Sequence, residues 1–226
     1  MSRGLGDVYK RQELPLNYQL MNNENFNWLA YENEAFDKGY TAICGVDEAG
    51  RGPLAGPVYA AAVVLPRGCI IDGVNDSKKI SEKKREMLFD VIINEARDFC
   101  IATASEKEID ELNILQATFL AMKRAVDGLK NKADFAIIDG NRMPPLNIPG
   151  ETLIHGDALC ESIAAASILA KVSRDRYMLE LAEKYPQYHF EKHKGYGTKL
   201  HYEMLEKYGP CEIHRRSFLK KWYENR

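Results

Sequence analysis

The sequence predicts an α/β fold, a mixed β-sheet flanked by helices, in one domain over residues 13–226. Short apolar runs come first and then alternate with helical patterns, which is the order expected of a mixed sheet covered by helices. A chain of 226 residues is long enough to bury a core without cross-links. No internal repeat or clear linker divides it, and residues 185–226 are expected to form a helical C-terminal extension.

The elements of the first half are indicated by apolar spacing and by turn residues. They are a helix over 25–38, strands over 41–46 and 58–65 separated by glycine and proline, and a helix over 82–97. Ser81 is the expected N-cap of that second helix. The apolar positions of the same helix are expected to make one buried face: Met87, Leu88, Val91 and Ile92.

The second half alternates between the two kinds of element. We expect strands over 99–104, 135–138 and 152–154, and helices over 112–129 and 158–184. Residues 163–170 are small or apolar on nearly every side of the last helix, so this stretch must be buried. A loop with Gly, His and Tyr spans 185–197, and two short helices close the chain.

Composition excludes several classes of protein. Lys and Arg number 31 against 33 Asp and Glu, so the net charge is −2, which excludes a wholesale basic coat for nucleic acid or a polybasic membrane binder. No run of 18 apolar residues is present, so no segment is expected to span a membrane. The charge is unevenly spread, because residues 185–226 hold nine Lys or Arg and five Glu.

The cysteines and the first residues bear on location. No CxxC pair is present, so a zinc site is not expected. Five isolated cysteines with apolar neighbours indicate reduced thiols and a cytoplasmic protein: Cys44, Cys69, Cys100, Cys160 and Cys211.

Residues 1–12 lack the apolar core of a signal peptide, and their string GLGDVYKRQ is typical of a translated sequencing adapter. We expect a non-native, poorly ordered leader there.

Two adjacent carboxylates, Asp47 and Glu48, follow an apolar strand. Neighbours in a regular strand point to opposite faces, so either the strand ends at Asp47 or only one of the two side chains faces a site. The alternative is a strand-to-turn junction with solvated acids. Next come Gly50, Arg51 and Gly52, whose glycines let the backbone approach a phosphate or a sugar hydroxyl. A plain glycine turn with a surface arginine is the alternative for this segment.

Ser77 and Lys78 lie just before the second expected helix. A hydroxyl, backbone N–H groups and a lysine at a helix N-terminus suit a phosphate. On these residues alone, a capping turn with solvated lysines is the favoured interpretation.

Asp139 and Asp157 complete an acidic set with Asp47 and Glu48. Asp139 ends a buried strand, where open sheets place their ligands, although an ordinary Asp-Gly turn is an equal alternative. Asp157 precedes the buried helix, whose small residues let it lie close to the sheet and bring Asp157 to the strand ends. The alternative is that Asp157 only caps that helix.

Four converging carboxylates would raise each other's pKa values, and a divalent cation removes that repulsion. Oxygen ligands alone favour Mg²⁺ or Mn²⁺ over zinc. Two such ions roughly 4 Å apart form the usual clamp for in-line attack on a phosphodiester. The sequence therefore predicts a two-metal phosphodiesterase site.

A ring between two glycines, Tyr196, lies in the loop near the C-terminus. Such a ring can stack on a base or a sugar, although a tyrosine packed on its own loop is the alternative. Four histidines in this region show no metal-binding spacing and are not expected to be ligands: His189, His193, His201 and His214. The basic flank beside an acidic site suits a polyanionic substrate.

Five segments together resemble the signature segments of bacterial ribonuclease HII, in that family's order. They are GVDEAGRGPLAGPVYAAAVVLP, NDSKKIS, IIDGN, HGDALCESIAAASILAKVSRDR and HKGYGT. The resemblance covers the chain from about Tyr40 to its C-terminus. It departs at His155, where a Lys or Arg before Gly-Asp is more usual, and this leaves the acidic assignments unaffected.

The resemblance implies a three-layer ribonuclease H-like fold and an endonuclease that depends on Mn²⁺ or Mg²⁺. Such an enzyme cuts the RNA strand of RNA–DNA hybrids and the 5′ side of a ribonucleotide embedded in duplex DNA, leaving 5′-phosphate and 3′-hydroxyl ends. Its four catalytic, metal-binding acids match Asp47, Glu48, Asp139 and Asp157.

The resemblance also implies how the substrate is held. Gly50, Arg51 and Gly52 match the loop that reads the 2′-OH at the RNA–DNA junction, the group that separates RNA from DNA. Tyr196 matches the tyrosine that packs on the following deoxyribose. The expected partners are RNA–DNA hybrid and ribonucleotide-containing duplex DNA, the protein is expected to be a monomer, and no clear motif for a replication clamp closes the chain.

Three alternative functions fit the sequence less well. A non-catalytic hybrid-binding module on the same fold is disfavoured because all four acids are present. A Mg²⁺-dependent phosphatase with Asp47 as nucleophile would need a second Asp two residues later, where Ala49 stands. The related ribonuclease HIII carries an additional N-terminal domain, whereas about 40 residues precede the first motif here.

Overall fold

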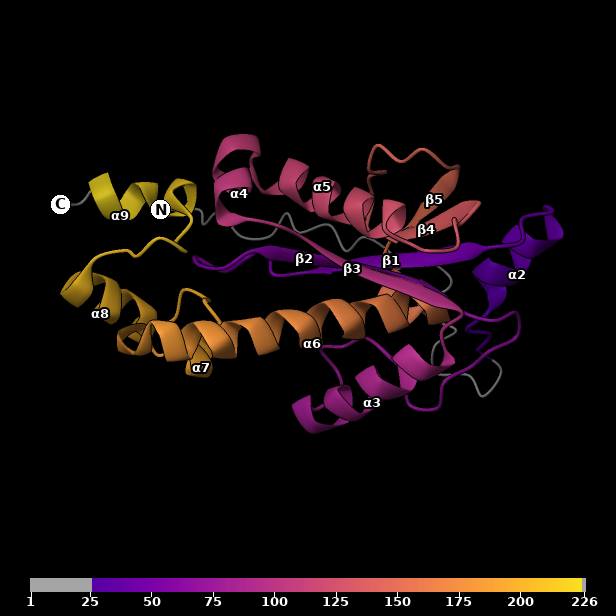
Figure 1. Ribbon diagram of the computed structural model, residues 1–226, viewed down its shortest axis with the longest axis horizontal. Helices are drawn as coiled ribbons and strands as arrows, with labels where there is room; N and C mark the ends of the chain where they lie inside the picture. The colour runs from indigo at the N-terminus through magenta and orange to yellow at the C-terminus, as the bar shows by residue number, and fades with distance from the viewer. Residues whose placement is uncertain (1–25, 225–226) are drawn as a thin grey trace, which may run out of the picture.

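The computed structural model describes residues 26–224, in which five strands form one mixed sheet (Figure 1). The strand order is β3-β2-β1-β4-β5. β2 pairs antiparallel with β1 and β3, whereas β4 pairs parallel with β1 and β5. The strands are β1 (Ile43–Ala49), β2 (Val58–Val64), β3 (Asp98–Ala104), β4 (Phe135–Asp139) and β5 (Gly150–Leu153). The leader expected at residues 1–12 lies outside the described residues.

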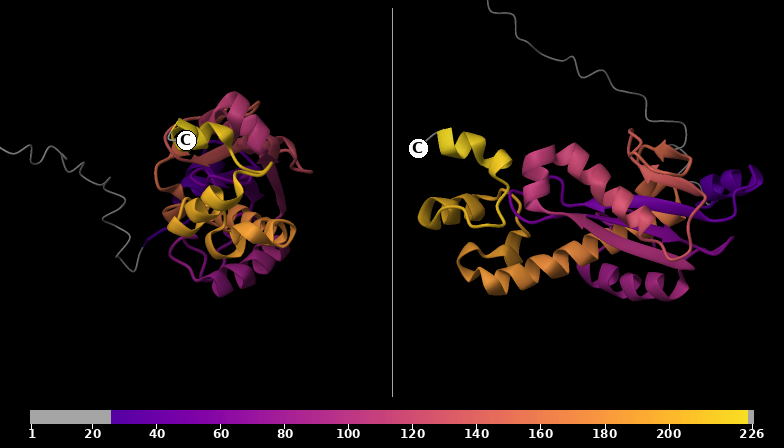
Figure 2. Two further views of the ribbon diagram at one scale, coloured as in Figure 1. Left: turned by 90° about the vertical axis from the view of Figure 1, so that its left-hand side faces the viewer. Right: turned by 45° about the horizontal axis from the view of Figure 1, so that its top comes forward.

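Helices cover both faces of this sheet, which confirms the expected three layers (Figures 1 and 2). On one face lie α4 (Glu106–Leu112) and α5 (Ile114–Asp127), whose buried residues share a cluster with β1 and β2. On the other face lies α6 (Glu161–Lys184), with α3 (Glu82–Glu95) packed on its outer side. A short helix, α2 (Ala30–Asp37), packs at the end of the sheet where β1 begins.

The C-terminal elements gather at the opposite end of the molecule from α2 (Figure 1). They are η2 (Pro186–Tyr188), α7 (Phe190–His193), α8 (Lys199–Tyr208), η3 (Arg216–Leu219) and α9 (Lys220–Glu224). An isolated β-bridge between Ala55 and His214, together with a hydrogen bond from the Gly56 N–H to the Ile213 carbonyl, helps to tie this helical subregion to the loop after β1. Within residues 26–224, no helix is both long and apolar enough to cross a membrane, and the five cysteines are unpaired as expected.

The helix predicted over 112–129 is α5, which begins at Ile114, and a separate short helix, α4, precedes it. The backbone at Asn113 has a φ of 73°, which ends α4, and the Asn113 side chain then accepts hydrogen bonds from the first turn of α5. The earlier helix, α4, was missed. Its signal was present in the sequence, because Ser105 and Glu108 form a capping box at its start.

The helix predicted over 82–97 is α3, and Ser81 caps it by accepting from the Lys84 N–H. The predicted buried face was partly wrong, because Met87 is 63% exposed and Val91 is also exposed. α3 packs against α6 rather than on the sheet, so its buried face follows the neighbouring helix and is formed by Leu88, Phe89 and Ile92.

Other bounds differ by a few residues. α2 begins at Ala30 rather than at 25, β5 ends at Leu153, and α6 begins at Glu161, after a 3₁₀ turn η1 (Gly156–Ala158). The most consequential difference concerns β1, which continues to Ala49 instead of ending at residue 46, because its pairing with β2 runs on to Tyr59. Both members of the acidic pair therefore belong to a regular strand.

The start of α6 lies directly on β1 at Gly45. A Cβ added to Gly45 would lie 2.2 Å from the carbonyl carbon of Ser162 and 2.3 Å from the nitrogen of Ile163. Only glycine permits this approach, since both contacts are to backbone that has no freedom to rotate away. The stretch 163–170 of α6 is fully or almost fully buried, as its sequence predicts.

Gly45→Ala is expected to lower the free energy of unfolding by about 2–3 kcal/mol, because the added methyl group forces α6 away from β1. Urea denaturation of the wild-type protein and the variant measures this difference. A loss below about 1 kcal/mol would show that α6 can shift without disturbing its packing.

Candidate active site

Three elements bring the acids together at the ends of the two central parallel strands. Asp47 lies on β1, Asp139 ends β4, and Asp157 lies in η1 directly before α6. The parallel register sets Val46 beside Ile138, so Asp47 and Asp139 are the next residues along each strand. Residues at the same register of neighbouring strands point to the same face, which here is the face covered by α6.

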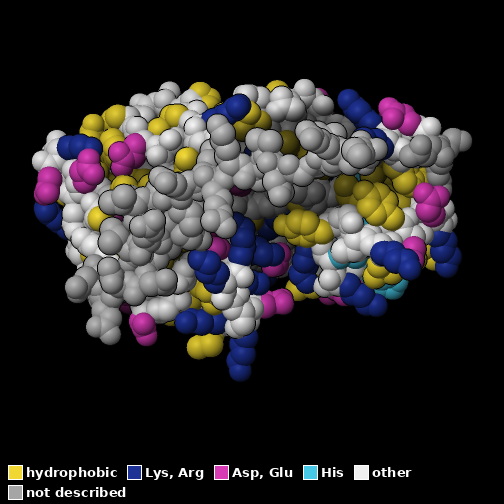
Figure 3. Space-filling view, turned by 180° about the vertical axis from the view of Figure 1, so that it is seen from behind, with side chains coloured by type: hydrophobic (Ala, Val, Ile, Leu, Met, Phe, Trp, Pro, Cys, Tyr) yellow, Lys and Arg dark blue, Asp and Glu magenta, His cyan; other side chains and the backbone are white. Residues whose placement is uncertain are grey.

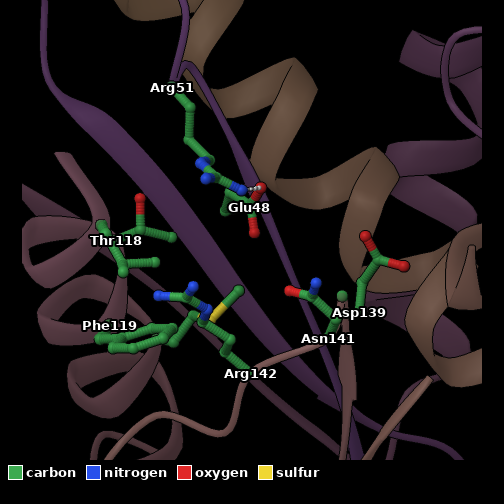
Figure 4. Close-up of a pocket in the computed structure, with 10 residues that line it drawn as sticks. Glu48, Arg51, Thr118, Phe119, Asp139, Asn141 and Arg142 are labelled. Carbon is green, nitrogen blue, oxygen red and sulfur yellow. Dashed lines mark hydrogen bonds and ion pairs between the residues drawn. The ribbon is translucent and has the colours of Figure 1, made fainter. Parts of the chain in front are cut away.

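Glu48 points to the other face of the sheet. It follows Asp47 in a regular strand, and on that side it borders a cavity lined in part by α5 (Figure 4). The sequence left open whether the strand ends at Asp47 or only one side chain faces the site. The strand does not end there, and Asp139, at the end of the adjacent strand, lies close enough to both carboxylates to raise the pKa of each.

The site is held together by backbone donors on one side of Asp139. The Gly156 N–H donates a 2.7 Å hydrogen bond to Asp139 Oδ1, which links the end of β4 to the turn that carries Asp157. Gly156 also packs against Ile163 of α6, so the turn is fixed to the start of that helix. The position of Asp157 therefore depends on how α6 is seated.

Burial and mutual repulsion make these acids hard to ionise. Burial raises the pKa of Asp47 well above its usual range, and Glu48, Asp139 and Asp157 raise it further. Burial likewise raises the pKa of Glu48 and of Asp139. For Asp157, burial followed by the nearby Asp139 raises the pKa to about 6. The site thus favours any species that brings positive charge to it.

Two cationic side chains border the acids. Lys78 Nζ lies 3.6 Å from Asp157 Oδ2, and its side chain is 81% exposed. Arg51 Nη1 lies 3.5 Å from Glu48 Oε1 and is half exposed. Both cationic side chains are at least half exposed, so they can turn toward an incoming anion.

Ser77 lies differently from Lys78. It is 4% exposed, and the Ser167 hydroxyl of α6 donates a 2.7 Å hydrogen bond to its hydroxyl. The Ser77 carbonyl accepts from Arg85 at the start of α3. In this arrangement Ser77 anchors the loop that presents Lys78, and its contact with substrate stays a prediction.

The donor set fits a divalent cation. Within residues 26–224, no three His, Cys, Asp or Glu side chains are arranged so that they could hold a metal ion as they stand. Four ionised carboxylates repel one another, so without a cation they are not expected to draw together fully. Carboxylate oxygens are the ligands that Mg²⁺ and Mn²⁺ prefer, and the pKa shifts show the repulsion that such a cation would relieve.

The Gly-Arg-Gly loop is fixed by a fully buried arginine, Arg215. Its guanidinium donates four hydrogen bonds of 2.6–3.0 Å, all to backbone carbonyls of this loop: those of Gly50, Arg51, Pro53 and Gly56. A planar guanidinium with five N–H donors can satisfy several carbonyls at once. The carbonyls of the loop are thereby turned inward.

A second fully buried arginine, Arg174 of α6, joins this loop to the one that carries Tyr196. It donates to the carbonyls of Ala55 and Pro57 in the first loop and of Lys194 in the second. Gly50 packs against it with a φ of 97°, and an added Cβ would lie 2.1 Å from Arg174 Nε. The glycine is therefore required both by its backbone conformation and by this contact.

Tyr196 lies beside the Gly-Arg-Gly loop. A Cβ added to Gly52 would lie 3.6 Å from the Tyr196 ring, and the Arg174 guanidinium lies 5.9 Å from the ring centroid. The ring is 44% exposed, so it is supported from within and open to solvent on its outer side. It is not merely packed on its own loop, which was the alternative.

Two buried histidines fix the backbone of Tyr196. The Cys211 N–H donates to His214 Nδ1, His214 Nε2 lies 3.0 Å from His201 Nε2, and His201 Nδ1 lies 2.9 Å from the Tyr196 carbonyl. These contacts are all satisfied when both rings are neutral and each donates to the next group. Burial lowers the pKa of each ring to about 4.

Sequence reasoning missed these arginines and histidines. Arg174 was detectable, because a charged residue in a helix predicted to be buried calls for buried partners. Arg215, His201 and His214 gave no such signal, since their partners are backbone carbonyls or side chains that only the folded chain brings near. His201 and His214 hydrogen-bond to each other, and the expectation that the histidines are not metal ligands stays a prediction.

Seen from behind, the molecule is hollowed near its middle, and Lys and Arg side chains gather with Asp and Glu around the hollow (Figure 3). A mixed sheet in this strand order, with acids at the ends of its two central parallel strands, defines a nuclease of the ribonuclease H class. The structure of ribonuclease H2 from Pyrococcus horikoshii OT3 is similar, with a TM-score of 0.68 and 28% identity over 82% of this chain and 100% of that one.

The sequence model of ribonuclease HII matches residues 44–221. The ribonuclease HII of Caldicellulosiruptor bescii is 58% identical over 198 residues, covering 88% of this chain and 96% of the relative. That of Acetivibrio thermocellus is 51% identical over 215 residues, covering 95% and 84%. The chain belongs to the ribonuclease HII family, and the expectation of a ribonuclease H-type endonuclease is confirmed.

The two neutral histidines make stability dependent on pH. Because the pKa of His201 is about 4 in the folded protein and near 6.5 in the unfolded chain, the unfolded chain binds more protons between these values. The stabilisation by the neutral ring is thus complete above pH 6.5 and is lost as the pH falls toward 4. The buried acids act in the opposite direction, so the effect must be measured against a variant that retains them.

At pH 7, His201→Gln should have a lower free energy of unfolding than the wild-type protein. This difference between the two proteins, the gap, should narrow by about 2 kcal/mol at pH 5. Urea denaturation at both pH values measures the gap, and the shared acids cancel in the comparison. His189→Gln, at a side chain that is 39% exposed, is the comparison variant outside the buried histidine pair. An unchanged gap for His201→Gln would contradict the neutral-ring assignment.

Proposed function

We propose that the chain hydrolyses the RNA strand of RNA–DNA hybrids and incises the 5′ side of ribonucleotides embedded in duplex DNA, leaving 5′-phosphate and 3′-hydroxyl ends. Family membership supports the ribonuclease activity. The proposed cut at an embedded ribonucleotide is supported by three neighbouring parts of the site. The acids, the rigid Gly-Arg-Gly loop and the exposed ring of Tyr196 lie side by side.

Asp47, Glu48, Asp139 and Asp157 would hold two divalent cations, Mn²⁺ or Mg²⁺. When bound, such a pair supplies an activated water and stabilises the leaving oxygen of an in-line displacement. The chain's own part is to keep four carboxylates at the strand ends, where β1, β4 and η1 meet. The individual contribution of Glu48 differs from the rest, because it approaches from the opposite face of the sheet.

The Gly-Arg-Gly loop is proposed to read the 2′-OH. Because Arg215 draws the loop carbonyls inward, the other edge of the loop faces the substrate in one fixed conformation. A preorganised loop loses little entropy when it binds, so a single hydroxyl can make a large difference in affinity. Lys78, beside Asp157, is proposed to contact the phosphate backbone.

Tyr196 is proposed to pack on the deoxyribose that follows the ribonucleotide. Its ring is held beside Gly52 by Arg174 from within and by His201 at its carbonyl. A rigid ring next to the loop that reads the 2′-OH would compare two successive sugars. We propose that the enzyme acts as a monomer, and its five free cysteines support a reducing compartment such as the cytoplasm.

The test of the activity uses duplex DNA with one embedded ribonucleotide, with Mg²⁺ or Mn²⁺. Asp47→Asn and Asp157→Asn should each lower the incision rate on the order of a hundredfold or more, since each removes a charge that holds the cations. Binding to an RNA–DNA hybrid should persist in both variants. Absence of incision by the wild-type protein under either metal would favour the alternative, a hybrid-binding module without catalysis.

Tyr196→Ala should lower kcat/KM on the embedded ribonucleotide by about tenfold, because base or sugar stacking contributes on the order of 1–3 kcal/mol. Its thermal unfolding should stay close to that of the wild-type protein, since Tyr196 is 44% exposed and the contact of its backbone carbonyl with His201 is kept. Tyr208→Ala, at a ring of similar exposure on α8, is the matched control and should leave incision unchanged. Equal kinetics of Tyr196→Ala and the wild-type protein would remove Tyr196 from the substrate site.

A further inference from the structure

A cavity of about 360 Å³ opens beside the acids on the α5 face of the sheet (Figure 4). One wall is formed by Glu48 and Asp139, and another by the loop that follows β4. The floor comes from α5: Leu115, Thr118, Phe119 and Met122. None of the roles discussed above uses this floor or the loop after β4.

Two guanidinium groups border this cavity, those of Arg51 and Arg142. Arg142 follows Asp139 by three residues and extends across to Phe119 on α5 (Figure 4). Glu48 lies between the two arginines in this view. A guanidinium on each side of Glu48 lets a polyanionic strand pass over this carboxylate, because each one offsets repulsion of the neighbouring phosphate.

The remaining lining suits a nucleotide rather than a bare anion. Phe119 and Leu115 are partly buried and give the cavity an apolar floor that a sugar or a base can cover. Asn141, next to Arg142, is exposed and adds a neutral donor and acceptor. A charged group at the rim over an apolar floor matches the chemistry of a phosphate joined to a sugar.

The position of the cavity relative to the Gly-Arg-Gly loop indicates which nucleotide of the substrate it would face. The Gly-Arg-Gly loop follows β1, and Arg142 follows β4. In the proposed function, the first loop reads the ribonucleotide on the 3′ side of the cut, and Tyr196 packs on the next sugar in the 3′ direction. Arg142 lies on the opposite side of Glu48 from Arg51 within the same cavity, so it would face the nucleotide on the 5′ side of the cut.

We propose that this cavity binds the deoxyribonucleotide immediately 5′ of the cut, and that Arg142 pairs with the phosphate on the 5′ side of that nucleotide. The proposal rests on the proposed function, since it takes its strand direction from there. In this proposal Arg142 binds the substrate through its positive charge, and Phe119 packs against the sugar.

The experiment combines protein variants with neutral linkages in the substrate. A duplex with one embedded ribonucleotide carries a methylphosphonate in place of the phosphate one linkage 5′ of the scissile one. A second duplex carries it two linkages 3′ of the scissile one. Incision kinetics are measured for the wild-type protein, Arg142→Gln, Arg142→Lys and, as a control, Arg97→Gln, an exposed arginine next to the edge strand β3.

The wild-type protein should lose about tenfold in kcat/KM on the 5′-modified duplex. The kcat/KM of Arg142→Gln should be about tenfold lower than that of the wild-type protein on the unmodified duplex. The 5′ methylphosphonate should lower it little further, because the arginine that would pair with that phosphate is already absent. Arg142→Lys should retain most activity, and Arg97→Gln should match the wild-type protein. The slope of log affinity against log salt should fall by about 1 in Arg142→Gln.

Two results would overturn the proposal. Losses from Arg142→Gln and the 5′ methylphosphonate that simply multiply would show that the two groups do not touch. Coupling of Arg142→Gln to the 3′ methylphosphonate instead would place the cavity on the wrong side of the cut. Failure of the proposed function is distinguishable from both, because the wild-type protein would then not incise the unmodified duplex. Arg142 is exposed on a loop, so thermal unfolding of Arg142→Gln should equal that of the wild-type protein.

Discussion

The contact between Gly45 and the start of α6 is the constraint on which the site depends. Because Gly45 carries no side chain, the backbone of Ser162 contacts β1 directly, and this contact fixes the distance between α6 and the sheet. Gly156, in the turn before α6, then reaches Asp139 with its N–H, which sets Asp157 beside the strand ends. A larger residue at position 45 would separate these acids without touching any of them.

The same helix organises the substrate side of the site. Arg174, farther along α6, donates to carbonyls of the loop after β1 and to the loop that carries Tyr196. The acids and the substrate loops are thus attached to one rigid helix, so their spacing is fixed by the 1.5 Å rise per residue of an α-helix. Arg215 adds the remaining carbonyl contacts from the C-terminal subregion, which explains why these distant segments pack together.

At this site, buried acidic side chains are surrounded by exposed basic ones. Burial and repulsion raise the pKa of the acids, so the site is prepared for cations rather than for solvent. Arg51, Lys78 and Arg142 lie around them and can meet a polyanion. A net charge of −2 therefore conceals a local arrangement in which basic side chains border an acidic site.

The sequence by itself determined the α/β class and most elements, and it indicated the candidate acids, because apolar periodicity and strand-end carboxylates are local signals. It did not determine the break at Asn113, which depends on a positive φ, or the face of α3, which depends on which neighbour covers it. Nor did it reveal that Arg215 holds the loop after β1, because its partners lie some 160 residues away in the chain. Only the tertiary structure decides such contacts, since backbone carbonyls are identical in every residue and carry no sequence signal.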